Sequence, residues 1–437
     1  MARRFMSFNR QFSGFFKLQT GDASDNAEHY LRGLTSTLRR KNIERMEERV
    51  GPMNYEAAQR FISESPWDEE PLLQEVARQA DGLLGGHRES ALYLDETAAG
   101  KKGTKSVGVA RQYNGRLGKV DNCQVIVSAA LGCGERVTLI DQRLYLPEEW
   151  IKDPQRCEKA GVPAEVVAQG MRTKWELALG LVDRAVAHGV RFEWVGADGG
   201  YGHVPEFLWG LVDRELEFMV EVHSNQHVYL VDPRPHQEAP SYEVREVAAI
   251  ISSKDWTKVT LRPSTKGPLT ARFWRKRIWI MEPAASPEGA PGQARVQAWW
   301  LLVREDSDGT RSYALSNASS QTTLGALAKR QAGRFWIERA FEDAKTEVGM
   351  VQYQVRGWRA LHHHLAMCVL ALLFITKERL LAQPHAPLVS AHDVVELLDF
   401  YLRHPATTET ALIDQIARRH VKRQQSIDSA QRKINTS

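Results

Sequence analysis

The sequence predicts an α/β fold in which helices pack on a mixed sheet. A Gly-Cys-Gly turn joins the second apolar run of strand length to the third, and stretches with helical periodicity separate the third run from the fourth and the fourth from the fifth. The order is therefore βββαβαβ, which is typical of a mixed sheet covered by helices. The five runs lie at residues 91–95, 123–131, 136–146, 190–198 and 217–222.

The residues before this sheet read as helices. Between about residues 25 and 80, apolar positions recur at roughly helical spacing, without the alternation typical of a strand. We expect a separate helical domain over residues 1–88 that binds DNA. Its first 50 residues hold ten Lys and Arg against six Asp and Glu. Arg39, Arg40 and Lys41 are the candidate contacts, and a solvated helix face is the alternative interpretation.

The second half of the chain changes character twice. Residues 224–318 carry aromatic-rich runs broken by Pro, Gly and Ser, which indicates an all-β insertion. This insertion divides the sheet domain into a first part at residues 89–223 and a second, helical part at residues 319–380. We expect residues 381–437 to form a helical segment that ends in a flexible basic tail.

Composition excludes several classes of protein. The 437 residues hold 58 Lys and Arg against 54 Asp and Glu, a net charge of +4 that by itself indicates no nucleic-acid partner. The four cysteines form no Cys-x-x-Cys pair, which argues against a zinc ribbon or a disulfide framework and favours the cytoplasm. No apolar run reaches the roughly 18–20 residues that span a bilayer, and no secretory leader is recognisable.

Two strands of the predicted sheet end in a carboxylate. Asp95 follows Ala-Leu-Tyr-Leu, and Asp198 follows Trp-Val-Gly-Ala. An aspartate at the end of an apolar strand is costly to bury unless it is paired or binds a metal ion. Hard divalent cations prefer such oxygen ligands, and a pair of them can promote phosphoryl transfer. A solvated strand end or a helix cap is the alternative for each aspartate.

A third carboxylate lies on a predicted helix. In the segment 334–345, the side chains of Arg334, Glu338, Glu342 and Lys345 fall on one helical face. Glu338 is therefore the candidate third metal ligand, with cations beside it. An ordinary helical ion pair between Arg334 and Glu338 is the alternative.

The motifs around these carboxylates resemble the DDE transposases of bacterial insertion sequences, most closely the insertion-sequence-701 type. The resemblance covers roughly residues 26–373. It is carried by Leu-Asp-Glu-Thr from Leu94, Gly-Arg-Leu-Gly-Lys-Val-Asp-Asn-Cys-Gln from Gly115, Ala-Asp-Gly-Gly-Tyr-Gly from Ala197, and the segment 334–345. The family's Y-(2)-R-(3)-E-(6)-K signature matches Arg334, Glu338 and Lys345, whereas Gln331 stands at the tyrosine position.

The resemblance implies an RNase H-like core with a β-strand insertion, and cut-and-paste transposition. Asp95, Asp198 and Glu338 would hold two Mg²⁺ or Mn²⁺ ions, while Arg334 and Lys345 would bind phosphate near the cut. The expected partners are the terminal inverted repeats and the target DNA, and a second copy of the chain in a homodimer. Two alternatives stay open: a transposase-derived DNA-binding regulator without catalysis, and a stand-alone metal-dependent nuclease. We expect the protein in the bacterial cytoplasm, associated with the nucleoid.

Two further stretches carry candidate DNA contacts. The segment 101–119 has no acidic residue and six cations interleaved with glycine, as suits a loop that follows phosphates, although a plain solvated loop would look the same. In the insertion, Trp274 with Arg275, Lys276 and Arg277 has the aromatic and cationic pattern that suits unpaired bases. A half-buried strand tryptophan is the alternative for Trp274, and Trp299 and Trp300 compete with it. The six cations are Lys101, Lys102, Lys105, Arg111, Arg116 and Lys119.

Overall fold

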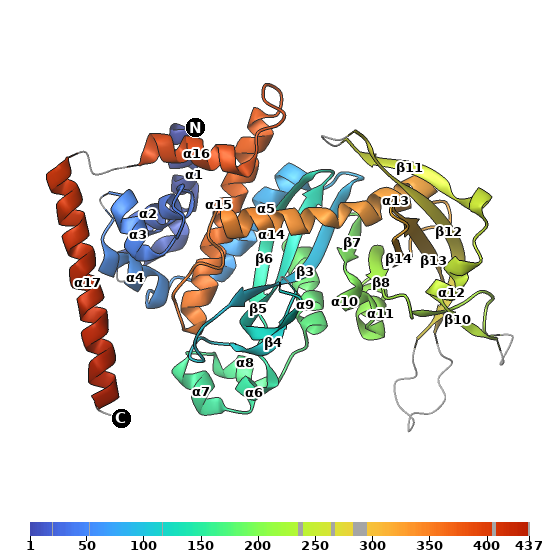
Figure 1. The fold of residues 1–437 in the computed structure, drawn as a ribbon, viewed down its shortest axis with the longest axis horizontal. Coiled ribbons are helices and arrows are strands. Elements are labelled where there is room, and N and C mark those ends of the chain that lie inside the picture. The colour runs from blue at the N-terminus through green and yellow to red at the C-terminus, as the bar shows by residue number, and fades with distance from the viewer. Residues whose placement is uncertain are drawn as a thin grey trace.

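A large mixed sheet with helices on both of its faces forms the centre of the molecule (Figure 1). The computed structural model describes the whole chain except Thr20, Pro52, Arg116 and residues 235–238, 264–266, 283–294, 404–407 and 436–437. Twelve of the described strands form one sheet, and β1 (Lys17–Leu18) and β2 (Gly21–Asp22) form a small separate pair. The predicted α/β class is confirmed. None of the described helices has both the length and the apolar character that crossing a membrane requires.

Five strands at one end of the sheet have the RNase H-like arrangement. They lie in the order β6–β5–β3–β7–β8, in which β3 pairs antiparallel with β5 and parallel with β7, and β7 pairs parallel with β8. The predicted three-strand meander and the two later strands are therefore confirmed. Their bounds are β3 (Ser90–Gly100), β5 (Lys119–Cys133), β6 (Arg136–Leu144), β7 (Trp194–Ala197) and β8 (Phe218–Val222). A further strand, β4 (Ala110–Asn114), pairs with the first part of β5.

Short helices connect these strands. A capping box between Thr173 and Glu176 begins α9 (Lys174–Ala187), whose apolar side packs on β5 and β3. Proline at the first position begins α11 (Pro205–Asp213). The other connecting helices are α6 (Glu148–Ile151), α7 (Pro154–Lys159), α8 (Ala164–Ala168) and α10 (Gly199–Gly202).

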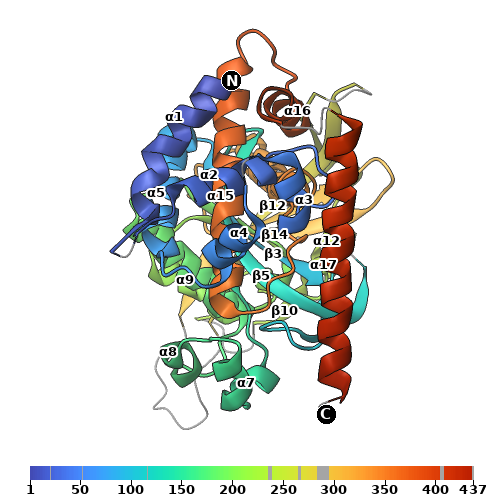
Figure 2. The same ribbon diagram turned by 90° about the vertical axis from the view of Figure 1, so that its left-hand side faces the viewer.

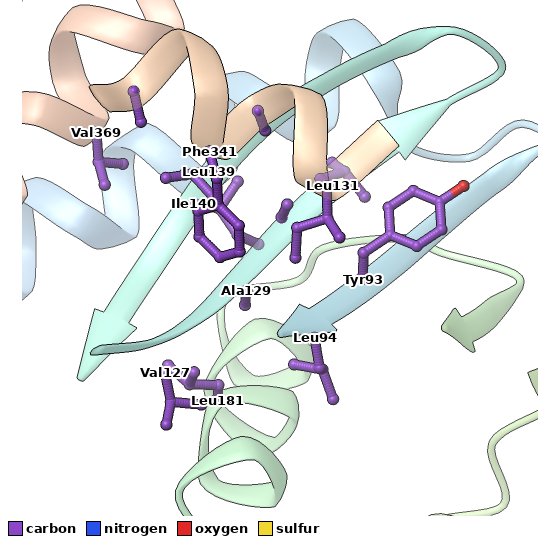
Figure 3. Packing of buried hydrophobic residues seen from close by; sticks show 14 of the residues in the cluster. Tyr93, Leu94, Val127, Ala129, Leu131, Leu139, Ile140, Leu181, Phe341 and Val369 are labelled. Atoms are coloured by element: carbon purple, nitrogen blue, oxygen red, sulfur yellow. The ribbon is translucent and has the colours of Figure 1, made fainter. Parts of the chain in front are cut away.

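The sheet is packed on both faces (Figure 3). On one face, Phe341 of α14 (Phe335–Thr346) and Val369 of α15 (Trp358–Ala382) lie over Ile140 of β6. On the other face, Leu181 of α9 lies against Val127 of β5. All five side chains are at most 5% exposed. Burial of apolar surface on both faces therefore fixes where α14 lies relative to the strands.

Helices form the N-terminal part, as predicted. An asparagine caps α3 (Ile43–Arg49) and another caps α4 (Tyr55–Ser63), and Asp68 caps α5 (Glu69–Leu84) by accepting a hydrogen bond from the backbone N–H of Glu70. The first helix is α1 (Ala2–Phe12), which the 3-10 turn η1 (Ser13–Phe16) follows directly. Helix α2 (Ser24–Leu34) comes after the β1–β2 pair.

The expectation that this helical part is separate is wrong. Helix α15 packs against α2, α4 and α5, and it is buried along most of its length. The Tyr30 hydroxyl lies 2.8 Å from Nδ1 of His364, and Arg4 forms an ion pair of 2.6 Å with the buried Glu378. The two parts share one core because the apolar surface of α15 extends beyond the sheet and has to be covered.

The insertion also differs from the expectation. It contains the helix α12 (Val244–Ala249) and the turn η2 (Ser253–Asp255), so it is not all-β. Its strand β14 pairs with β8, which makes the insertion a continuation of the core sheet. The pairing satisfies backbone groups that β8 would otherwise expose at an edge. The inserted strands are β9 (His227–Tyr229), β10 (Ser241–Glu243), β11 (Thr257–Arg262), β12 (Leu269–Met281), β13 (Val296–Glu305) and β14 (Arg311–Ser316).

After β14, the described secondary-structure elements are all helices. Helix α13 (Leu324–Gly333) leads almost directly into α14, and α16 (Ala391–Leu402) packs on α15. The residues expected to form a flexible tail instead form the helix α17 (Glu409–Asn435), which runs beside the N-terminal helices (Figure 2). Arg419 of α17 forms an ion pair with Glu48 of α3, a contact that the local sequence could not indicate.

The packing of α14 gives the first testable prediction. Replacing the buried Phe341 by alanine should lower the free energy of unfolding by about 3–5 kcal/mol, since it leaves a cavity between the helix and the sheet. Phe335 on the same helix is 41% exposed, and its replacement by alanine should cost about 1 kcal/mol or less. Denaturant unfolding followed by circular dichroism measures both values. Equal losses for the two variants would contradict the packing of α14 described above.

Candidate active site

The parallel pairing of β3 with β7 brings Asp95 next to Asp198. The pairing ends at Leu94 and Ala197, so the next residue of each strand is an aspartate. Asp198 ends its strand, as predicted. Asp95 does not, because β3 continues to pair with β5 as far as Gly100. The expected strand end at Asp95 is therefore wrong, although the expected proximity of the two carboxylates is found.

The glycines after Asp198 allow the chain to leave β7 in a sharp turn and to form α10 against β8. The Asp198 carboxylate accepts a hydrogen bond of 2.9 Å from the backbone N–H of Gly200 and begins α10. A Cβ atom at Gly202 would lie 1.8 Å from the carbonyl oxygen of Glu221, so only glycine lets α10 approach β8 so closely. The predicted sharp turn beside Asp198 is present.

Helix α14 supplies the third carboxylate and a cation. Glu338 lies in its first turn, and Arg334 lies at the junction with α13. The guanidinium of Arg334 donates a hydrogen bond of 2.8 Å to Glu338, and it lies 3.1 Å from a carboxylate oxygen of Glu221 and 3.9 Å from one of Asp95. Asp198 also acts electrostatically on Arg334. The guanidinium therefore lies among carboxylates from β3, β7, β8 and α14.

Burial and repulsion from neighbouring carboxylates disfavour the ionised form of these acidic side chains. Burial raises the pKa of Asp95 well above its usual range, and the nearby Asp198 raises it further. Burial also raises the pKa of Asp198 and that of Glu221. Arg334 acts in the opposite direction on all three groups. The cluster therefore favours a positive partner, whether a guanidinium or a metal ion.

The donor set fits a hard divalent cation. Asp95, Asp198 and Glu338 offer only carboxylate oxygens, the ligands that Mg²⁺ and Mn²⁺ prefer. In the described part of the chain, no three Asp, Glu, His or Cys side chains are already arranged as a metal site. Here the guanidinium of Arg334, held by Glu221 and Glu338, supplies the positive charge.

The sequence reasoning missed Glu221 and Glu96. Glu221 is the one charged residue within the apolar strand β8. A single charge in an otherwise apolar strand was the sequence feature that could have indicated a site residue. Glu96, directly after Asp95, forms an ion pair of 2.6 Å with Lys174 of α9 and raises the pKa of Asp198 electrostatically. Two more acidic groups therefore act on the site than the strand-end pattern indicated.

A family model described as "DDE superfamily endonuclease" matches residues 15–278, which is more than half of the chain. The chain belongs to this superfamily. The matched range includes Asp95 and Asp198, and it ends before Glu338. Endonucleases of this superfamily generally use divalent metal ions, in agreement with the oxygen donors of the site.

Two individual proteins are similar to this DDE endonuclease. The "Probable transposase for insertion sequence element IS701" of Microchaete diplosiphon is 27% identical over 331 residues, which are 74% of each chain. Together with the family match, it confirms the resemblance to insertion-sequence-701 transposases. The structural match with the NurA nuclease from Sulfolobus solfataricus covers 62% of this chain and 85% of the nuclease chain, at 10% identity and a TM-score of 0.28. A likeness this weak says nothing about the fold.

The basic residues of the segment 101–119 lie mostly in solvent. Lys102, Lys105, Arg111 and Lys119 are exposed, and Arg116 lies outside the described residues. Lys101 is half-buried, with its ammonium 3.4 Å from the centre of the Tyr353 ring. The segment includes β4, so it is not a single loop. On α14, Lys345 follows Glu338 by two helical turns, about 10.5 Å along the axis, and its ammonium lies 5.6 Å from the Phe341 ring centre.

The N-terminal basic cluster is split by burial. Arg39 and Arg40 are exposed, whereas Lys41 is 2% exposed and cannot contact DNA. Its ammonium donates hydrogen bonds to the carbonyl oxygens of Leu34 (2.7 Å), Glu347 (2.5 Å) and Ser36. These carbonyls lie at or near the ends of α2 and α14, where backbone acceptors lack partners within the helix. The DNA contact predicted for Lys41 is therefore wrong: this lysine joins the N-terminal helices to α14.

The aromatic and basic residues of the insertion mostly contact other parts of the protein. The guanidinium of Arg275 stacks on Trp300 at 4.2 Å and donates to the carbonyl of Thr322, and that of Arg277 donates to backbone carbonyls. Trp274 is half-buried and Lys276 is exposed, so these two remain accessible. The competing residues Trp299 and Trp300 are 1% and 8% exposed, which leaves no face free to stack on a base.

The burial of Lys41 gives the second prediction. Burial lowers its pKa to about 8, yet the ammonium satisfies three backbone carbonyls. Lys41→Met should lower the free energy of unfolding by about 1–3 kcal/mol, because it leaves buried acceptors without donors. The control is Arg40→Met, at the exposed neighbouring position, which should change stability by about 0.5 kcal/mol or less. Thermal and denaturant unfolding measure both; a larger loss at Arg40 would contradict the assignment.

Proposed function

We propose that this chain is a DNA transposase that cleaves the ends of an insertion sequence and transfers the freed 3′-OH to target DNA. The observation that carries the proposal is the convergence of Asp95, Asp198 and Glu338 around Arg334, from two neighbouring strands and a covering helix. Membership of the DDE endonuclease superfamily and the similarity to a probable transposase support it.

Each residue of the site has a proposed role. Asp95, Asp198 and Glu338 would hold two divalent ions, Mg²⁺ or Mn²⁺. When bound, such ions make water and then a 3′-OH effective nucleophiles at neutral pH and stabilise the leaving oxygen. Arg334 would then bind a non-bridging phosphate oxygen with its planar guanidinium, and Glu221 would orient it. Lys345 would contact phosphate further along the strand.

The reaction suggests the partners. Two element ends have to be cut and joined in one assembly, which favours a homodimer bound to both terminal inverted repeats and then to target DNA. The substrate would be chromosomal DNA in the bacterial cytoplasm, at the nucleoid. The intact carboxylates argue against a regulator without catalysis. A stand-alone nuclease would cut DNA without forming strand-transfer products, which separates it from a transposase.

The third prediction tests the catalytic assignment. Asp198→Asn keeps the shape of the side chain and removes its charge, so metal-dependent nicking of end DNA should fall at least about 100-fold. Asp255→Asn replaces an exposed aspartate of η2 and should nick at the wild-type rate. Gel analysis of labelled duplexes incubated with Mg²⁺ reports both nicking and joined products. DNA binding by the wild type without metal-dependent nicking would refute the proposal, and so would unimpaired nicking by Asp198→Asn.

A further inference from the structure

A basic groove lies at the boundary between the N-terminal helices and the sheet domain. It has a volume of about 720 Å³ and is bounded by three segments that are far apart in the sequence. The first is the N-terminal helical part, with Tyr30 of α2 and residues 41–59 on and around α3 and α4. The second is the loop at residues 101–106, and the third is the segment 353–356 after α14. The groove therefore forms only when the helical part and the sheet domain are packed together.

The charges that line this groove are all positive. Lys101, Lys102 and Lys105 come from the loop, Arg356 comes from the segment after α14, and the buried Lys41 lies at the base of the N-terminal wall. No aspartate or glutamate is among the described lining residues. Lys102, Lys105 and Arg356 are exposed, and their side chains have no hydrogen bond or ion pair with any described residue. Like charges gathered without counterions repel one another, so the groove favours an anionic ligand.

Cations at the neighbouring contact between α5 and the sheet domain are compensated by carboxylates. Arg184 contacts both Asp141 and Glu70, and Arg143 contacts the same two carboxylates. These pairs stabilise the contact of α5 with the sheet domain. In contrast, the cations of the groove face a space that can admit a ligand.

The wall of the groove is held in place before any ligand binds. The ammonium of Lys101 lies 3.4 Å from the centre of the Tyr353 ring. The Tyr353 hydroxyl donates a hydrogen bond of 2.8 Å to the side chain of Gln124 on β5, and that side chain donates one of 2.6 Å to the carbonyl of Val107. Burial lowers the pKa of Lys101 to about 8, as expected for a cation that lacks a carboxylate partner.

The elements that carry the proposed catalytic carboxylates lead into the groove. Strand β3 continues from Asp95 to Gly100 and enters the loop 101–106 directly; five residues of strand span about 17 Å. Helix α14 carries Glu338 in its first turn, ends at Thr346, and is followed by the segment with Tyr353 and Arg356. The phosphates of one DNA strand are spaced about 3.4 Å apart along the axis, so 17 Å corresponds to about five nucleotides.

We infer that this groove binds the phosphate backbone of the DNA substrate about five nucleotides from the phosphate at the carboxylates. The distance of about five nucleotides rests on the proposed function, because it is counted from the phosphate that is cut. The recognition of phosphates rests on the cations without partners. Lys102, Lys105 and Arg356 would bind phosphate oxygens, and Tyr55 and Gln59 would form the opposite wall. Such contacts fix the register of the DNA and are independent of its sequence. The N-terminal helices and the sheet domain would thus hold one DNA strand together.

The double variant Lys102→Ala/Lys105→Ala tests the groove. Both side chains are exposed and without partners among the described residues, so folding should be unaffected. The affinity for a short DNA duplex is measured by fluorescence anisotropy at a series of salt concentrations. The slope of log K against log salt is negative, and each lost phosphate contact should reduce its magnitude by about 0.9. The slope of the double variant should therefore be shallower than that of the wild type by about 1.8. The matched control, Lys254→Ala/Lys258→Ala in the insertion, replaces two exposed lysines and should keep the wild-type slope.

A second measurement locates the contact. Neutral methylphosphonates replace the phosphates of the duplex one position at a time. In the wild type, a substitution about five nucleotides from the nick should weaken binding, and in the double variant the same substitution should have no effect. An unchanged salt slope, or an equal loss in the control, overturns the groove assignment even where nicking is normal. An absence of nicking by the wild type refutes the proposed function and leaves the slope test valid.

Discussion

The parallel pairing of β3 with β7 is the constraint on which the rest of the site depends. It ends at Leu94 and Ala197 and leaves Asp95 and Asp198 side by side at the edge of an apolar core. Burial raises the pKa of both carboxylates; Asp198 raises that of Asp95 further, and Glu96 raises that of Asp198. The cluster is tolerated because Arg334 brings a positive charge to it, and because glycine at position 202 lets the chain turn away over β8.

Packing at a distance from the carboxylates determines where the guanidinium of Arg334 lies. Phe341 packs α14 against the sheet, and Arg334, at the start of this helix, contacts Asp95, Glu221 and Glu338. At the other end of α14, the buried Lys41 holds the carbonyl of Glu347. A change in the N-terminal helices can therefore reach the site through α14. The same packing forms the basic groove, which couples DNA binding to the position of this helix.

The sequence predicted the parts of the site that depend on local pattern. The order of the five core strands along the chain, the turn after Asp198 and the helix bearing Glu338 follow from periodicity and spacing within short segments, and the structure has all three. The burial of Lys41 could not be predicted, since Arg39, Arg40 and Lys41 are alike in local sequence. It depends on how the chain folds around Lys41, including a contact with Glu347 more than 300 residues away. The pairing of β14 with β8 and the role of Glu221 likewise depend on contacts across the fold. Resemblance to a known family supplied the expected roles, which pattern alone left open.

The central claim is that β3, β7 and α14 together hold a divalent metal ion. Iron-mediated cleavage tests it most directly: with added hydrogen peroxide and ascorbate, Fe²⁺ bound in place of Mg²⁺ reduces the peroxide to hydroxyl radicals that cut the backbone near its ligands. With DNA present, the account predicts cuts near Asp95, Asp198 and Glu338 at once, and their suppression by excess Mg²⁺ and by Asp198→Asn. Cuts confined to other segments, or cuts at these positions that survive in Asp198→Asn, would contradict it.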